Sequence, residues 1–471
     1  MKTGLAVSDD VNHNLAAIPQ CTADHLMSTA ALSGVPLSRS DSISERTNGI
    51  KSLGWAGLTQ AVGLMIRLGS NLLLARMLAP ESYGILGSAM AALTTLEWLS
   101  DMGILPALIR HERGNELSYL LTGWWIGLAR GIVISLSAVV AAGPLAAFSR
   151  QPALVGILIG LSIRPLIFAL RSPGIPALKR SLNYRALFID EITQTVIGTL
   201  VSLTMVWATH SIWAIVAGTL AGALSGVIVS YRLAPLRPRL CWNPDAARDI
   251  DHFGRQVFLN TLIMAIWLNM DRLIGLRFVS LSAMGVYAVA WNLASVLEAL
   301  VTRACDVYFT MLARRGDASA QADWHFSLER KLTCVVFPLG ITAIALSPPA
   351  IRLLYDPRYA GAQAIFAIMV SRLLMRSLGQ FHFQYLLAGA RVHLATRAYG
   401  VALVLQVLLV ALLVPQLGTT GLALAALGST TVLTFVQTWL ISRGSVRDYA
   451  CFAMTFAAVA CGLILAAVQL G

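Results

Sequence analysis

Apolar segments of about 20 residues recur along the chain from residue 52, separated by short polar connections. An α-helix needs a segment of about this length to cross the hydrocarbon core of a bilayer, whereas barrel strands alternate over about 10 residues. The pattern therefore predicts an all-α polytopic membrane protein with about 12–14 transmembrane helices. We count thirteen segments, near 52–75, 83–103, 118–142, 152–170, 187–207, 211–230, 256–279, 283–304, 330–347, 362–386, 394–414, 419–441 and 449–470.

The polar stretches are informative as well. Residues 1–50 are rich in Ser, Thr, Asn and Asp, without the apolar core of a signal peptide, so we expect a disordered cytoplasmic tail. Translation starting at Met27 is an alternative interpretation. Residues 246–253 are interpreted as a short surface helix, and residues 314–330, with Trp324 and Phe326, as a stretch that lies on the membrane surface.

Positive charge alternates between the two sides of the predicted bundle. With a cytoplasmic N-terminus, the cytoplasmic connections carry twenty Arg and Lys residues and the opposite connections five: Arg76, Arg150, Arg277, Arg352 and Arg358. This asymmetry is the positive-inside rule, and it accounts for the net charge of +12 without a nucleic-acid partner. An unpaired thirteenth segment places the C-terminus outside the cytoplasm if the segment crosses, and inside if it does not.

An arginine, a glycine and a glutamate recur with the same spacing in two parts of the chain. Arg76, Gly84 and Glu97 recur at a single offset as Arg277, Gly285 and Glu298, together with the hydropathy pattern. We therefore divide residues 51–231 and 256–441 into two six-helix lobes, joined by a cytoplasmic linker (232–255) and followed by an extra hydrophobic helix (442–471). Lobes with even helix numbers share one orientation, so a pseudo-two-fold axis along the membrane normal should relate them.

Charged residues inside the apolar segments are the candidate functional groups, because each costs several kcal/mol at mid-bilayer unless it is paired or hydrated. Six are arginines, whose planar guanidinium matches phosphate geometry, and we predict that they bind an anionic substrate. The alternative is that each clamps two helices through a nearby acid. Arg372 and Arg376 lie one turn apart in a segment without an acid, which favours a cavity for these two. The six are Arg67, Arg130, Arg164, Arg272, Arg372 and Arg376, and we treat them as unrepeated between the lobes.

The acidic residues have other predicted roles. Asp271 lies near the middle of its segment, where a buried carboxylate with a raised pKa can carry a proton, so it is the candidate for ion coupling. Glu97, Asp101 and Glu298 lie toward the cytoplasmic ends and are candidates for gate or interlobe contacts.

Motifs of several enzyme classes are missing. The sequence contains no GxxxxGK[ST], HExxH or GxSxG, its eight histidines are scattered, and its six cysteines lack CxxC or metal-ligand spacing. We therefore predict no catalytic residue, cofactor, metal site or disulfide framework, and no enzyme activity. The longest non-cytoplasmic connection, about 347–361, is short for the site of a sugar polymerase or ligase.

Several motifs in order resemble the Wzx-like polysaccharide flippases of the multidrug/oligosaccharidyl-lipid/polysaccharide exporter superfamily. They are residues 74–84, 101–103, 107–109, 176–180, 184–185, 269–273, 285–287, 387–391 and 418–423. The resemblance implies two lobes around a central cavity and alternating access that moves undecaprenyl-pyrophosphate-linked oligosaccharide across the bacterial inner membrane. It implies membrane lipids, a polymerase and a copolymerase as partners, and the pyrophosphate as a target for the arginines.

Three alternatives stay open. A proton- or sodium-coupled drug exporter of the same superfamily should have an acidic or apolar cavity, which the arginines disfavour. A flippase for the peptidoglycan lipid precursor would suit the same anionic chemistry. A membrane polymerase or ligase is the remote alternative because the outer connections are short.

Overall fold

The computed structural model describes residues 42–99, 104, 108, 113–181, 183–313, 318–355, 357–359, 361–389, 391–442, 449, 452–457 and 459–460. Regular secondary structure within these residues is helical throughout. Asp101 lies outside them, as do residues 1–41 and most of the predicted segment 449–470.

The described residues of the N-terminal half form six long helices and a short one. Local chemistry marks their ends: Asn183 caps α8 by accepting a hydrogen bond from the backbone N–H of Ala186, and Arg150 ends α5 in the left-handed region. The helices are α2 (Ser42–Met77), α3 (Pro80–Leu99), α5 (Leu117–Ser149), α6 (Ala153–Ala169), α7 (Ile175–Arg180), α8 (Tyr184–Thr209) and α9 (Trp213–Leu233).

The C-terminal half contains a 50-residue helix, α15 (Val392–Ile441), that is broken at Gly418. Gly418 has φ 55° and ψ −128°, a conformation open only to glycine, and it follows Pro415, which cannot donate a helical hydrogen bond. The predicted segments 394–414 and 419–441 lie on either side of this break. The other helices are α10 (Pro244–Phe278), α11 (Leu281–Ala313), α12 (Ala318–Ala345), α13 (Ser347–Leu354), η2 (Pro357–Tyr359) and α14 (Ala362–Ala388).

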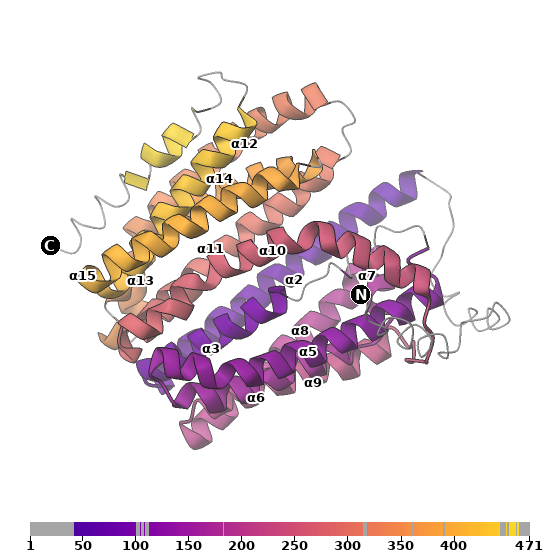
Figure 1. The fold of residues 1–471 in the computed structure, drawn as a ribbon, viewed down its shortest axis with the longest axis horizontal. Coiled ribbons are helices and arrows are strands. Elements are labelled where there is room, and N and C mark those ends of the chain that lie inside the picture. The colour runs from indigo at the N-terminus through magenta and orange to yellow at the C-terminus, as the bar shows by residue number, and fades with distance from the viewer. Residues whose placement is uncertain are drawn as a thin grey trace, which may run out of the picture.

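The two halves lie side by side and repeat one packing pattern (Figure 1). In the N-terminal half α2 packs on α8, α3 on α6, α5 on α6, and α8 on α9. In the C-terminal half α10 packs on α15, α11 on α14, and α12 on α14. The halves meet through α2, α3 and α5 on one side and α10 and α11 on the other.

The repeated glycines Gly84 and Gly285 allow the halves to meet closely at one end. A Cβ atom on Gly84 would lie 2.4 Å from the carbonyl oxygen of Leu281, and one on Gly285 would lie 1.9 Å from that of Pro80. Pro80 and Leu281 are the first residues of α3 and α11, so each glycine contacts the start of the other helix. This reciprocal contact is what a pseudo-two-fold axis between the halves requires.

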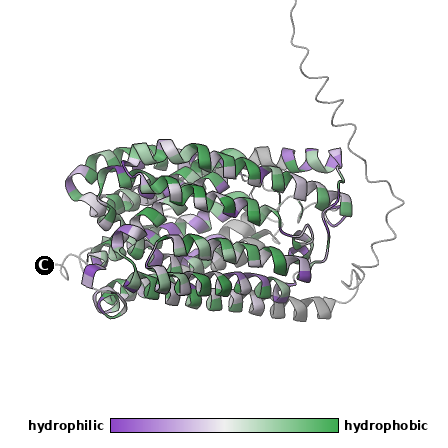
Figure 2. Cartoon of the chain, turned by 90° about the horizontal axis from the view of Figure 1, so that it is seen from below, coloured by the Kyte–Doolittle hydropathy of each residue, from purple (hydrophilic) through white to green (hydrophobic). Residues whose placement is uncertain are grey.

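The outer surface is suited to lipid. Seven described helices are long and apolar enough to cross a membrane, or eight if the pair Trp324–Ala345 and Ser347–Leu353, bent by 55°, is one span. The broken α15 counts once in this number. Large apolar side chains such as Val140, Trp207 and Leu412 are well exposed. Hydrophobic residues predominate along the helices in Figure 2. The chain is a multi-pass membrane protein, and the number of 12–14 spans stays a prediction.

Four local features differ from the expectations. Residues 246–253 are the start of α10, capped by Asn243, and not a separate surface helix. Residues 318–330 belong to α12, where the ring of Trp324 stacks on Tyr308 of α11. Cys241 is disulfide-bonded, whereas the cysteine spacing predicted no disulfide framework. In addition, α2 begins at Ser42, within the stretch expected to be a tail.

Candidate functional site

A cavity of about 740 Å³ lies between the two halves. Its walls come from α2, α3, α6, α8 and α9 of the N-terminal half and from α10 and α11 of the C-terminal half. The lining combines guanidinium groups, side-chain amides and hydroxyls with apolar and aromatic surface. Among the described lining residues are three arginines (Arg67, Arg164 and Arg272) and no aspartate or glutamate.

Arg67 projects from α2 toward α8. Its Nη2 lies 3.2 Å from Oε1 of Glu191, and the side chains remain 54% and 41% exposed. An ion pair this exposed stabilises a protein by only about 0–1 kcal/mol. Arg67 can therefore exchange Glu191 for another anion at little cost.

Arg164 on α6 is held by the repeated glutamate of α3. Its Nη1 lies 3.0 Å from Oε1 of Glu97, with side chains 34% and 25% exposed. Arg130 of α5 approaches the same residue from another side, since its Nη2 donates to the backbone carbonyl of Glu97 at 2.6 Å. Arg130 does not line the cavity.

Arg272 brings a positive charge into the cavity from the C-terminal half. Its guanidinium carbon lies 4.5 Å from the centre of the Trp291 ring, and its Nη2 donates to Oδ1 of Asn269. Within the described residues no carboxylate forms an ion pair with Arg272, and its buried Nε has no hydrogen-bond partner. Stacking on an aromatic face holds a guanidinium in place while leaving its edge free for an anion.

Asp271 and Arg372 form a buried pair beside this wall. Asp271 Oδ2 lies 3.5 Å from Arg372 Nη1, and the side chains are 0% and 3% exposed. The carboxylate also accepts hydrogen bonds from the hydroxyl of Tyr287 and from the backbone N–H of Arg272. Arg372 in turn faces the rings of Trp267 and Trp291. Arg372 is therefore held inside the C-terminal half and does not line the large cavity.

Arg376 and Glu298 form another ion pair in the C-terminal half, joining α14 to α11. Both line a hollow of about 10 Å³ next to Trp291, too small for a substrate. The pair repeats Arg164–Glu97, which joins α6 to α3 at the equivalent position of the N-terminal half. The expectation that the arginines have no counterpart in the other half is therefore wrong for Arg164 and Arg376.

The structure divides the predicted arginines into groups. Three line the cavity, two are paired within the C-terminal half, and Arg130 supports α3. Glu97 and Glu298 each pair within their own half, while Asp101 is outside the described residues. The binding, coupling and gate roles stay predictions.

Sequence reasoning missed the polar and aromatic residues of the cavity wall. Trp291 contacts both Arg272 and Arg372, but a tryptophan in an apolar segment looks like an ordinary core residue. Asn71, Gln194 and Asn292 were also missed. Their position within predicted spans was the available signal, since uncharged amides there need polar partners too.

The family of the chain follows from residues 73–364, which match the family described as polysaccharide biosynthesis protein. The chain belongs to this family. The succinoglycan biosynthesis transport protein ExoT of Rhizobium meliloti (strain 1021) is 22% identical over 324 residues, covering 68% of this chain and 65% of ExoT. The lipopolysaccharide biosynthesis protein WzxC of Escherichia coli (strain K12) is 23% identical, covering 75% of this chain and 72% of WzxC.

The chain aligns with only part of the length of these relatives. The teichuronic acid biosynthesis protein TuaB of Bacillus subtilis (strain 168) is 23% identical, covering 63% of this chain and 62% of TuaB. The chain thus spans just under two thirds of the length of ExoT and TuaB.

Two solved structures share the fold. The lipid II flippase MurJ in an inward closed conformation superposes with a TM-score of 0.63 at 12% identity, covering 89% of this chain and 98% of MurJ. An inward-facing multidrug resistance transporter of the MATE family superposes with a TM-score of 0.60 at 12% identity, covering 85% and 95%. These neighbours, like ExoT, are transport proteins and not enzymes, and they support a two-lobe, pseudo-symmetric architecture.

Proposed function

We propose that the protein is a flippase that moves undecaprenyl-pyrophosphate-linked oligosaccharide units across the bacterial inner membrane by alternating access. Such units feed exopolysaccharide, capsule or O-antigen synthesis. The observation that carries the proposal is the cavity between the halves, lined by Arg67, Arg164 and Arg272 without an acidic residue among its described lining.

The charges of the cavity suit a pyrophosphate. Arg272 has no carboxylate ion-pair partner in the described chain, so its guanidinium can pair with a phosphate group of the substrate. Arg67 has an exposed partner that it can release. Guanidinium groups bind phosphate oxygens through paired, charge-assisted hydrogen bonds. The amides of Asn71, Gln194 and Asn292 can bind sugar hydroxyl groups.

Alternating access requires that the halves separate at one end while they close at the other. The Gly84–Gly285 contact closes the end at which α3 and α11 begin. At that end Arg76 donates to the carbonyl of Leu353, and Arg358 donates to the carbonyl of Arg76. The charge count predicts this end to be extracytoplasmic, with the N-terminus in the cytoplasm, so we assign the present conformation as closed to the outside.

The alternatives differ in the charge of their substrate. A drug exporter for cations is disfavoured because three arginines in the cavity would repel its substrate. A flippase for the peptidoglycan lipid precursor shares the pyrophosphate and stays the second candidate. A polysaccharide polymerase and a copolymerase are proposed partners of the oligosaccharide flippase.

The proposal can be tested in the native host after deletion of the gene. Wild-type protein should restore surface polysaccharide, whereas Arg67→Ala/Arg164→Ala/Arg272→Ala should not and should accumulate the lipid-linked unit on the cytoplasmic leaflet. Arg248→Ala is the matched control, since Arg248 is 80% exposed and pairs with neighbouring Asp245 in an exposed contact. Normal polysaccharide in a triple variant of normal membrane abundance would reject the proposal.

A further inference from the structure

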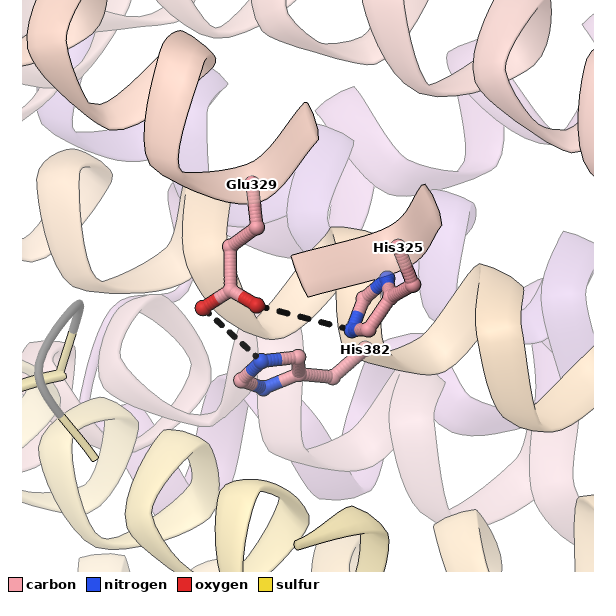
Figure 3. A group of neighbouring side chains, drawn as sticks. All are labelled: His325, Glu329 and His382. Carbon is pink, nitrogen blue, oxygen red and sulfur yellow. Dashed lines mark hydrogen bonds and ion pairs between the residues drawn. The ribbon is translucent and has the colours of Figure 1, made fainter. Parts of the chain in front are cut away.

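Two histidines and a glutamate meet inside the C-terminal half (Figure 3). His325 and Glu329 lie one turn apart on α12, and His382 reaches them from α14. The three side chains are buried, with exposures of 0%, 2% and 0%. Their potential ligand atoms all lie within 4.8 Å of one another.

Both imidazole rings present the same nitrogen to the carboxylate. Nε2 of His325 lies 3.6 Å from Oε2 of Glu329, and Nε2 of His382 lies 3.3 Å from Oε1. Each ring uses its other nitrogen, Nδ1, toward a hydroxyl group: Tyr308 at 2.5 Å for His325 and Thr438 at 3.4 Å for His382. Histidines that bind a metal through one nitrogen are typically oriented by a hydrogen bond at the other.

The cluster is not satisfied by its own hydrogen bonds. Nε2 of His325 and Oε2 of Glu329 are buried and have no hydrogen-bond partner among the described atoms. A buried polar atom without a partner costs about 1–3 kcal/mol in general, and a buried carboxylate costs more. A cation among the three side chains would satisfy both atoms and compensate the carboxylate charge.

The separations also fit coordination of one ion. Zinc binds imidazole nitrogen and carboxylate oxygen at roughly 2.0–2.2 Å with tetrahedral geometry, which separates neighbouring ligand atoms by roughly 3.3–3.6 Å. The distance from Nε2 of His382 to Oε1 of Glu329, 3.3 Å, falls at this separation, and Nε2 of His325 lies 3.6 Å from the other oxygen of the same carboxylate. Two neutral imidazoles with one carboxylate form a ligand set that suits Zn²⁺ and leaves a fourth position open.

We propose that His325, Glu329 and His382 bind one Zn²⁺ ion that joins α12 to α14. Tyr308 of α11 and Thr438 of α15 orient the two imidazoles, so four helices of the C-terminal half converge on the ion. None of the five residues lines the cavity, and the site is independent of the proposed transport function.

Zinc binding is testable on the full-length protein, purified without a polyhistidine tag and treated with a chelator. Titration with Zn²⁺ should give one bound ion per chain and a rise in Tm, and Co²⁺ should give the visible absorption of a four-coordinate nitrogen–oxygen site. Glu329→Gln and His382→Gln should weaken zinc binding by about 100-fold or more. His393→Gln is the control, because His393 is exposed at the start of α15, and it should bind zinc as the wild type does.

Two conservative variants keep the test valid if a ligand variant does not fold. Tyr308→Phe and Thr438→Val retain all three ligands and should weaken zinc binding by about 10–100-fold, the usual effect of losing an orienting hydrogen bond. A wild-type protein that binds no Zn²⁺, or a His382→Gln protein that binds it unchanged, would overturn the proposal. Stoichiometric iron without zinc would overturn the choice of metal.

Discussion

Asp271 Oδ2 lies 3.5 Å from Arg372 Nη1, and both side chains are almost completely buried. The pair joins α10 to α14 next to the cavity wall formed by Arg272 and Trp291. Nη1 and Nη2 of Arg372 have no hydrogen-bond partner among the described atoms, so the carboxylate and two aromatic rings compensate its charge. The interhelical clamp, the alternative to a substrate contact, is therefore the observed arrangement at Arg372.

Removing one member of this pair should destabilise the protein strongly. Arg372→Met leaves the carboxylate of Asp271 buried without its counter-ion, at a cost of about 3–5 kcal/mol. The double variant Asp271→Asn/Arg372→Met removes both charges and should recover most of the stability. Thermal aggregation of the detergent-solubilised protein measures the effect, and Arg248→Ala, which breaks an exposed pair, should lose at most about 1 kcal/mol. Equal stability of Arg372→Met and wild type would contradict the buried clamp.

The same double variant tests the coupling role of Asp271. A proton-carrying carboxylate makes transport depend on the external pH, whereas an asparagine cannot titrate. If Asp271 couples transport to protons, Asp271→Asn/Arg372→Met should be stable but export polysaccharide without the wild-type dependence on external pH. An unchanged pH profile in the double variant would leave Asp271 with a structural role alone.

The roles of Arg67 and Glu191 can be distinguished because their substitutions should affect transport differently. If Arg67 binds the pyrophosphate, Arg67→Ala should reduce export by about tenfold or more, since a charge-assisted contact contributes about 1.5–3 kcal/mol. Glu191→Gln keeps the guanidinium and removes its competitor, so export should be retained. Export can be measured as surface polysaccharide per unit of protein in the membrane. Equal losses in both variants would instead show that the ion pair matters only for structure.

The contribution of Arg272 to export should depend on its planar guanidinium group and not only on its charge. Arg272→Lys keeps a cation but loses the stacking on Trp291 and the paired donors that fit phosphate oxygens. We expect the lysine variant to export almost as poorly as Arg272→Ala, with unchanged membrane abundance. Trp291→Phe keeps an aromatic face and should export better than Trp291→Ala. Full export by the lysine variant would reduce the role of Arg272 to a point charge.

Apolar periodicity predicts the helices of this protein well because a bilayer imposes one length and one composition on each crossing segment. The repeated Arg76–Gly84–Glu97 set likewise predicts two similar halves, and in the structure its glycine forms the contact between them. Its glutamate forms an equivalent ion pair in each half, with Arg164 and with Arg376. The spacing between these partners differs between the halves, so a single sequence offset could not pair the two arginines.

The partners of the charged residues depend on tertiary packing that a single segment does not encode. Arg372 has no acid in its own segment, yet Asp271 reaches it from a helix about one hundred residues earlier. The histidine cluster was missed for the same reason: His325 and Glu329 lie in a stretch interpreted as membrane surface, and His382 lies on another helix. The i, i+4 spacing of His325 and Glu329 was the signal that the sequence offered.

Gly285 should control closure of the end at which the halves meet. In Gly285→Ala the new methyl group would meet the Pro80 carbonyl at 1.9 Å, a backbone atom that cannot move aside easily. Overpacking of this kind costs about 1–3 kcal/mol, which corresponds to a roughly 5–150-fold shift away from the closed state. A cysteine introduced at the cavity residue Met90 should therefore react faster with an impermeant maleimide added from outside. Gly127→Ala is the matched control, because nothing lies within 4 Å of its new methyl group, and it should not alter labelling. Equal labelling rates in the two variants would show that this glycine contact does not hold the outer end closed.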